Sequence, residues 1–153
     1  ARCDACPLAA RCVARRDGRT AQLPAPRARK PVPERIVTWL VLMHAGRVLL
    51  ERRPAPGLWG GLWALPESEP RAFAAVCRRR FGCEARSAHR LDPIEHPFTH
   101  FRLRATPAVI ALRAAPAAGV EAPGRIWLDL TDASGAAVPA PVKRLLARLA
   151  AGR

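Results

Sequence analysis

The chain has 153 residues, of which 50% are apolar, so it is long enough for one folded domain with a single core. No apolar run approaches the roughly 18 residues that a membrane-spanning helix needs, which excludes such a helix. Basic residues number 26 against 12 acidic ones, a net charge of +14, and all but Lys30 and Lys143 are arginine. This charge favours a polyanionic partner such as nucleic acid or a membrane surface, although an arginine- and alanine-rich proteome would give the same composition.

Three cysteines lie close together near the N-terminus. Cys3, Cys6 and Cys12 form a C-x2-C-x5-C pattern, which can bring three thiolates to one centre and is typical of zinc and iron–sulfur sites. Both kinds of site normally take four ligands, so a fourth must come from elsewhere. For zinc this could be a distant histidine, Cys77 or Cys83, and for a cluster it would be a residue upstream. Cys77 is more typical of a core position, because it lies on the apolar face of a predicted helix.

The sequence therefore looks like the later part of a longer protein. It has no segment that resembles a secretion signal, and its five cysteines fit a disulfide framework poorly because their number is odd. We expect a reducing, cytoplasmic location.

A basic, proline-rich segment at residues 13–35 follows the cysteine loop at residues 1–12. It carries seven positive charges and cannot bury enough apolar surface to fold alone. We therefore predict an extended linker that leads to a folded domain at residues 36–153. A linker of this charge would also contact phosphates beside a nucleic-acid-binding domain, and Arg29 and Lys30 are its predicted contacts.

The first half of the folded domain predicts a β-hairpin followed by a helix. Residues 36–43 are apolar and largely β-branched, which is typical of a strand buried on both faces. Residues 47–52 follow after a tight turn as the hairpin partner. Ser68 or Glu69 is expected to cap a helix that has Pro70 in its first turn and ends at Gly82. Glu67 and Glu69 look like a capping pair.

The second half predicts further strands and a terminal helix. Apolar and polar residues alternate over residues 98–105, which indicates a half-buried strand, interrupted at Pro107 and resumed at residues 109–112. A short strand is expected at residues 126–128, and apolar residues at helical spacing over residues 142–149 predict an amphipathic helix. Returning strands around two helices predict an α+β fold.

Five motifs, in this order, resemble the adenine DNA glycosylases of the MutY family. The cysteine pattern is similar to the last three ligands of the family's C-x6-C-x2-C-x5-C loop. The later motifs are RPAPGLWGGLWALPE at residues 53–67, Phe98-Thr99-His100-Phe101, Trp127, and PAPVKRLL at residues 139–146. In the glycine-rich motif, Trp59 and Trp63 are more typical of core residues than of base-stacking platforms.

The resemblance implies a Nudix-like (MutT-like) mixed sheet with two helices, preceded by the cysteine loop and the linker. It implies that the complete protein is a monomeric glycosylase that binds double-stranded DNA and flips out and removes adenine mispaired with 8-oxoguanine. The family's catalytic residues lie in a helical domain before the cysteine loop. We therefore assign no catalytic residue here and expect this chain to be inactive alone. Such base excision repair would take place at the nucleoid of a bacterial-type cytoplasm.

The resemblance also implies three groups of site residues. Those that would contact 8-oxoguanine are Phe98, Thr99 and His100. Those at the DNA backbone would be Arg29, Lys30 and Arg102. Those that would hold a 4Fe-4S cluster, with a fourth cysteine upstream, are Cys3, Cys6 and Cys12. Thr99 stands where the family usually has serine, and it keeps the hydroxyl. Without the resemblance, Thr99 and His100 would be interpreted as a turn hydroxyl and a strand-edge histidine.

Two other hypotheses remain open. A diverged Nudix nucleotide hydrolase would need the pattern G-x5-E-x7-R-E-U-x-E-E-x-G-U, whose glutamates hold the Mg²⁺ that bridges a pyrophosphate. Gly61 and Glu67 match its start, but three later carboxylate positions are occupied by Val76, Arg79 and Arg80. The pattern thus keeps the frame of the fold and loses the metal site. The second hypothesis is a non-catalytic, zinc-containing nucleic-acid-binding module.

Overall fold

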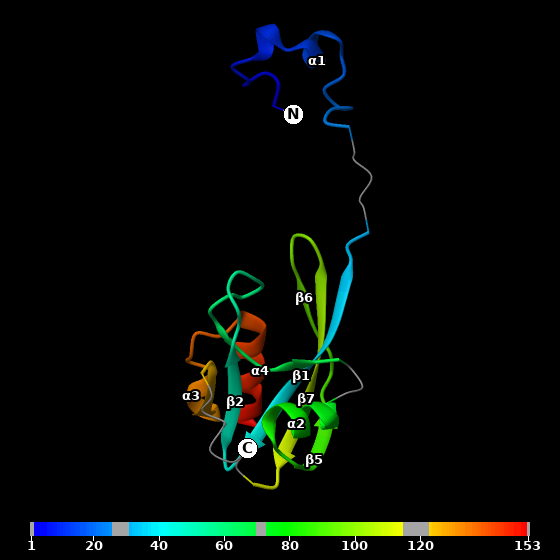
Figure 1. Ribbon diagram of the computed structural model, residues 1–153. Coiled ribbons are helices and arrows are strands. Elements are labelled where there is room, and N and C mark those ends of the chain that lie inside the picture. The colour runs from blue at the N-terminus through cyan, green and yellow to red at the C-terminus, as the bar shows by residue number, and fades with distance from the viewer. Residues whose placement is uncertain (1, 26–30, 70–72, 115–122, 153) are drawn as a thin grey trace. The chain divides into compact units, whose positions relative to one another are not determined.

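The computed structural model describes residues 2–25, 31–69, 73–114 and 123–152. The chain divides into two compact units, Ala1–Pro31 and Val32–Arg153 (Figure 1). The first contains a short 3-10 helix, η1 (Ala9–Arg11), and one helical turn, α1 (Val13–Arg16). Arg15 donates to the carbonyl oxygen of Cys3 at 3.0 Å and forms an ion pair with Asp4 at 3.3 Å. These contacts tie a turn of helix to the cysteine loop where the sequence predicts extended chain. The division at residues 1–12, 13–35 and 36–153 remains a prediction.

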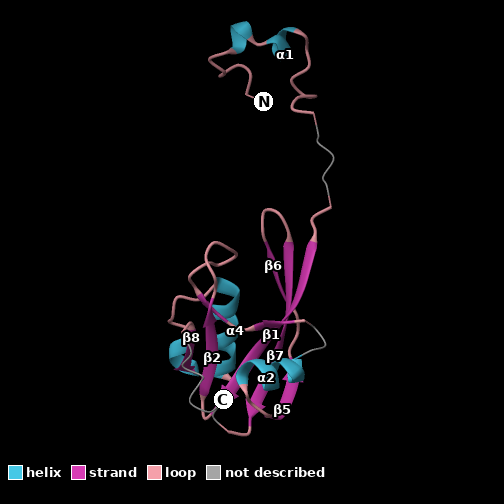
Figure 2. Cartoon of the chain, in the orientation of Figure 1, coloured by secondary structure: helices cyan, strands magenta, loops and turns pink. Residues whose placement is uncertain are grey.

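A mixed sheet of eight strands forms the centre of the described part of the second unit (Figure 2). The strands are β1 (Glu34–His44), β2 (Arg47–Arg52), β3 (Trp63–Ala64), β4 (Glu67–Ser68), β5 (Ala85–Arg90), β6 (Ile94–Pro97), β7 (Arg102–Leu112) and β8 (Arg125–Asp129). The main path runs β3-β2-β1-β7-β5, with β8 paired to β2, β4 to β1 and β6 to β7. The long strands β1 and β7 are parallel and the other described pairs are antiparallel, which confirms the predicted mixed sheet.

Helices cover both faces of this sheet (Figure 2). They are α2 (Phe73–Phe81) on one face, and α4 (Ala140–Ala151) with the short α3 (Leu130–Ala133) on the other. Because side chains alternate along a strand, Trp39 and Val41 of β1 pack with α4, whereas Leu40 and Leu42 pack with α2. Both predicted helices are therefore confirmed, and α3 is additional. Across the described ranges, no helix is both long and apolar enough to cross a membrane.

The predicted turns are confirmed, but the predicted capping pair is not. Ala45 and Gly46 have φ angles of 44° and 85°, which is the left-handed pair that a tight β1–β2 hairpin needs. Gly82, at φ 58°, ends α2 as expected. Glu67 is not a helix cap, because it lies in β4 and its carboxylate forms ion pairs with two arginines.

Strand β7 runs unbroken through Pro107, so the predicted interruption is wrong. Pro107 is in register with Trp39 of β1, and its carbonyl oxygen accepts the N–H of Leu91 at 2.9 Å. The side of the strand on which its N–H is missing therefore faces the connection between Arg90, where β5 ends, and Ile94, where β6 begins. The regular ladder of β5 ends at Arg90, so the missing N–H of Pro107 falls outside it, where proline is tolerated.

Candidate functional site

The three residues expected to contact 8-oxoguanine lie at the tip of the β6–β7 hairpin. Pro97 and Arg102 form the last pair of the ladder, and the N–H of Phe98 donates to the carbonyl oxygen of Phe101 at 2.8 Å. This bond leaves Thr99 and His100 as a two-residue tip, and both are exposed. Within the described part of the chain, neither side chain has a hydrogen-bond partner.

Aromatic rings support this tip from the core outward. Phe98 stacks on Phe101, with ring centroids 4.6 Å apart and planes at 21°. It also contacts His96 edge-on at 4.7 Å and Trp59 at 5.5 Å. Trp59 in turn lies 6.3 Å from Trp39, which is buried in the core. A continuous row of rings therefore joins the sheet to the exposed tip.

The glycine-rich loop after β2 positions Trp59 in that row. Trp59 itself has a φ of 57°, and Gly61 follows at 79°. A Cβ at Gly60 would lie 3.3 Å from the Cα of Ala55 and from the carbonyl oxygen of Gly57, which are tight contacts that favour glycine at this position. Trp59 and Trp63 both pack against the core, as expected. The contact of Trp59 with Phe98 was not predicted, because only the fold brings these two motifs together.

The residues proposed at the DNA backbone are only partly described. Arg102 is exposed at the start of β7, directly after the tip. Arg104 is exposed two residues further on, in register with Glu95 of β6. Arg29 and Lys30 lie outside the described residues.

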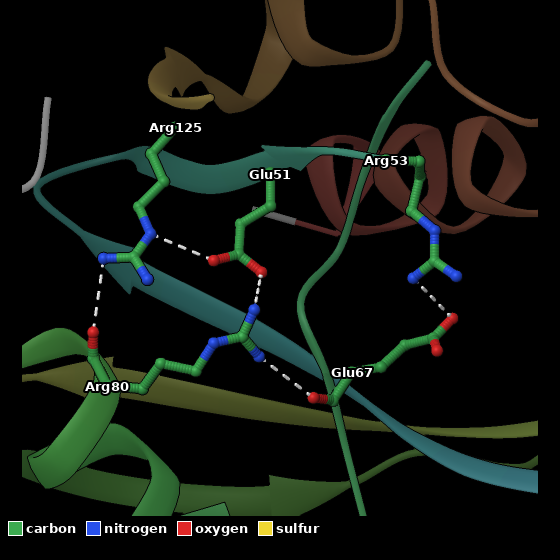
Figure 3. A network of polar contacts seen from close by, with 5 residues as sticks. All are labelled: Glu51, Arg53, Glu67, Arg80 and Arg125. Carbon is green, nitrogen blue, oxygen red and sulfur yellow. Dashed lines mark hydrogen bonds and ion pairs between the residues drawn. The ribbon is translucent and has the colours of Figure 1, made fainter. Parts of the chain in front are cut away.

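A second group of polar residues lines a cavity of about 440 Å³ between β2, β4, β8 and the end of α2 (Figure 3). Glu51 of β2 pairs with Arg80 at the end of α2 and with Arg125 of β8, the latter at 3.0 Å. Glu67 of β4 pairs with Arg53 at 3.2 Å and with Arg35 at 2.9 Å. Arg80 also donates to the backbone carbonyl oxygen of Glu67 at 3.3 Å, which joins the two groups. Sequence reasoning missed Glu51 and Arg125, because they belong to strands that only the fold brings together.

Comparison with known proteins identifies the fold. Residues 37–148, more than half of the chain, match the family described as NUDIX domain. The chain belongs to the Nudix domain family. An adenine DNA glycosylase of Buchnera aphidicola subsp. Acyrthosiphon pisum (strain APS) is 22% identical over 145 residues, which cover 95% of this chain and 41% of that protein. A second, from Buchnera aphidicola subsp. Schizaphis graminum (strain Sg), is 20% identical and is covered to 42%. The chain thus spans about two fifths of the length of these relatives.

Solved structures agree with this assignment. The crystal structure of the complex between the C-terminal domain of mouse MUTYH and human PCNA matches with a TM-score of 0.61 and 27% identity, over 77% of this chain and 88% of that chain. The MutT protein from Methanosarcina mazei Go1 matches with a TM-score of 0.61 and 18% identity, over 78% of this chain and 95% of that one, which shows the fold alone. The similarity to the C-terminal, Nudix-like part of adenine DNA glycosylases is therefore confirmed.

The cavity of this Nudix domain does not fit the Mg²⁺ ion that the family's hydrolases hold. Arg80 occupies one of the expected carboxylate positions and points to Glu51 (Figure 3). Each of the two cavity glutamates already contacts two guanidinium groups, whose charge opposes that of a divalent cation. Within the described ranges, no three His, Cys, Asp or Glu residues gather in a way that could hold a metal ion.

The five cysteines divide between the two units. Cys3, Cys6 and Cys12 are exposed or partly exposed and do not converge on one centre, so their role as cluster ligands remains a prediction. Cys77 lies in α2 and Cys83 follows that helix, and both are buried in the core cluster between α2 and the sheet, which confirms the core interpretation of Cys77. Burial, with a smaller contribution from Cys83, raises the pKa of the Cys77 thiol from 9.0 to about 12, and burial also raises the pKa of Cys83.

Proposed function

We propose that this chain is the lesion-recognition part of an adenine DNA glycosylase, which removes adenine mispaired with 8-oxoguanine in double-stranded DNA. The observation that carries the proposal is the exposed Thr99-His100 tip, which a row of aromatic rings holds in place. The similarity to glycosylases along 95% of the chain supports it. Catalysis would belong to other parts of the complete protein, and this chain alone would be inactive. A cytoplasmic, nucleoid-associated location is part of the same proposal.

The chemistry of the lesion matches the groups at the tip. Guanine presents an acceptor at N7 in the major groove, whereas oxidation at C8 turns N7 into a donor and adds a carbonyl oxygen beside it. The Thr99 hydroxyl can accept from N7–H or donate to the new oxygen. His100 can donate to a phosphate, and the half-buried ring of Phe98 can lie beside the base. Recognition of the lesion therefore rests on Thr99, with its two neighbours fixing the geometry.

Two further assignments belong to this proposal. Arg102, with Arg29 and Lys30, would contact the DNA backbone and add affinity that does not depend on sequence. Cys3, Cys6 and Cys12 would supply three of the four ligands of a 4Fe-4S cluster in the complete protein. The contacts proposed between the hairpin tip and the lesion involve none of these cysteines.

The test uses the complete glycosylase with Thr99→Ala and His100→Ala combined. Loss of one or two hydrogen bonds is worth roughly 0.5–3 kcal/mol, or about two- to a hundredfold. The preference for adenine opposite 8-oxoguanine over adenine opposite guanine should fall by that factor in single-turnover assays at fixed salt. Activity on the undamaged mispair should fall less, and the salt dependence should hardly change, because no phosphate-pairing arginine is removed.

A matched control is Ser87→Ala combined with His89→Ala, which removes a hydroxyl and an imidazole that are also exposed, from β5. This control should keep the parental preference. If the Thr99/His100 variant also keeps it, the hairpin tip does not recognise the lesion and has only a structural role.

A further inference from the structure

The cavity beside β2 and β8 carries more positive than negative charge. Its charged lining residues are Arg52, Arg53, Arg80, Arg125, Glu51 and Glu67. Four arginines against two glutamates leave a formal charge of +2. At about 440 Å³ the cavity has room for a small polyatomic anion in place of several water molecules. None of these residues belongs to the hairpin tip.

The guanidinium groups of the cavity have more donors than their partners can accept. Arg53 reaches Glu67 through Nη1, while its Nε is buried and has no hydrogen-bond partner within the described chain. Arg125 uses Nε for Glu51 and Nη1 for the carbonyl oxygen of Arg80. Both oxygens of each glutamate already contact a guanidinium group. The cavity therefore has more hydrogen-bond donors than acceptors, which favours a ligand that supplies acceptor atoms.

The arginines are also held in place before any ligand binds. The guanidinium groups of Arg80 and Arg125 lie 5.3 and 4.8 Å from the centroid of the Phe81 ring, which is buried. Glu51 forms ion pairs with the same two arginines (Figure 3). Cation–π contact and the shared carboxylate keep two like charges together that would otherwise separate. A ligand that binds these arginines would therefore lose little free energy to the ordering of their side chains.

We propose that this cavity binds a phosphate group directly through guanidinium groups, without a metal ion. Planar guanidinium groups bind phosphate oxygens in pairs, and their charge matches that of the anion. Where a Nudix hydrolase places carboxylates for a cation, this chain places Arg80 and inverts the sign of the site. The phosphate can come from a free nucleotide or from the DNA backbone. The inference stands independently of the proposed lesion recognition.

The test is calorimetric titration of the 153-residue chain with inorganic diphosphate at low salt. Saturable binding is expected, and Arg80→Gln should weaken it by roughly ten- to a hundredfold, the range for a hydrogen bond to a charged group. Arg79→Gln is the matched control, because Arg79 precedes Arg80 in α2, is exposed and lies outside the cavity. It removes the same charge from the chain and should leave the affinity nearly unchanged.

Two further variants keep the test decisive if Arg80→Gln folds poorly. Glu51→Gln removes a competing carboxylate and should tighten diphosphate binding, whereas a purely structural network predicts no binding to tighten. Arg125→Lys keeps the charge but loses the planar guanidinium group and should weaken binding.

Competition identifies the source of the phosphate group. Displacement of diphosphate by an undamaged duplex points to a backbone phosphate, and displacement only by a nucleoside diphosphate points to a nucleotide. Absence of saturable binding, or equal affinity in the Arg79 and Arg80 variants, would overturn the proposal.

Discussion

The stack of Phe101 on Phe98 provides a direct measure of how the recognition tip is held. Phe101→Leu keeps an apolar side chain of similar size but removes the ring whose centroid lies 4.6 Å from that of Phe98. Aromatic pairs of this geometry contribute about 0.5–1.5 kcal/mol beyond the area that they bury. The free energy of unfolding should therefore fall by about 1 kcal/mol, while the backbone hydrogen bond that closes the tip is retained.

Urea unfolding followed by tryptophan fluorescence measures this loss. Ile110→Val is the matched control, because Ile110 is fully buried on the opposite face of the sheet, against α2. Its expected cost of about 0.5–1.5 kcal/mol is the same. In the complete glycosylase, Phe101→Leu should lower the preference for adenine opposite 8-oxoguanine by up to about tenfold, the factor that corresponds to 1.4 kcal/mol. Ile110→Val should leave this preference unchanged.

Two outcomes would refute this reasoning. If both variants lower the preference equally, the effect comes from global stability and the rings do not position the tip. If Phe101→Leu leaves the free energy of unfolding unchanged, the stack contributes nothing that leucine cannot replace.

Three more predictions concern the buried thiols and the cavity. In the native chain, Cys3, Cys6 and Cys12 should react quickly with a thiol reagent at neutral pH, and Cys77 and Cys83 only after denaturation; rapid labelling of all five would contradict the packing around α2. Because burial raises the folded pKa of Cys77 above its unfolded value, its contribution to stability is complete below pH 9 and is lost as the pH rises toward 12. Urea titrations across this range should show a smaller loss in Cys77→Ala than in the parent. With Mg²⁺, the chain should not hydrolyse 8-oxo-dGTP, because guanidinium groups hold both cavity carboxylates; turnover that Glu67→Gln abolishes would refute this.

Periodicity predicted the central strands and the terminal helix well, because burial alone determines them. Residues 37–42 are buried without a break, and that pattern is legible in the sequence. Strand β5 is different, since five of its six residues are exposed and only pairing with β7 orders them. The interruption predicted at Pro107 was wrong for a related reason. A missing N–H is tolerated there because β7 changes its partner from β5 to β6 at this point, and the sequence near Pro107 does not show this change.

The candidate sites were predictable as motifs but not as assemblies. Resemblance indicated the Phe98-Thr99-His100 tip, and the Nudix pattern indicated that Arg80 replaces a carboxylate. The partners of these residues come from distant segments. Glu51 and Arg125 meet Arg80 only when β2 and β8 pair, a register that no local pattern encodes.

The glycine-rich loop and the hairpin tip act as one structural unit. Two-residue hairpins are usually closed by residues at positive φ, most often asparagine or glycine. Within the described chain, Ala45 and Trp59 are the only residues other than glycine with positive φ, so the Thr99-His100 tip lacks that local device. Its conformation therefore depends on the neighbouring Phe98, whose ring packs against Phe101, His96 and Trp59. Because Trp59 reaches the tip only through the bend that Gly60 and Gly61 allow, the glycines of this motif serve to position the hairpin.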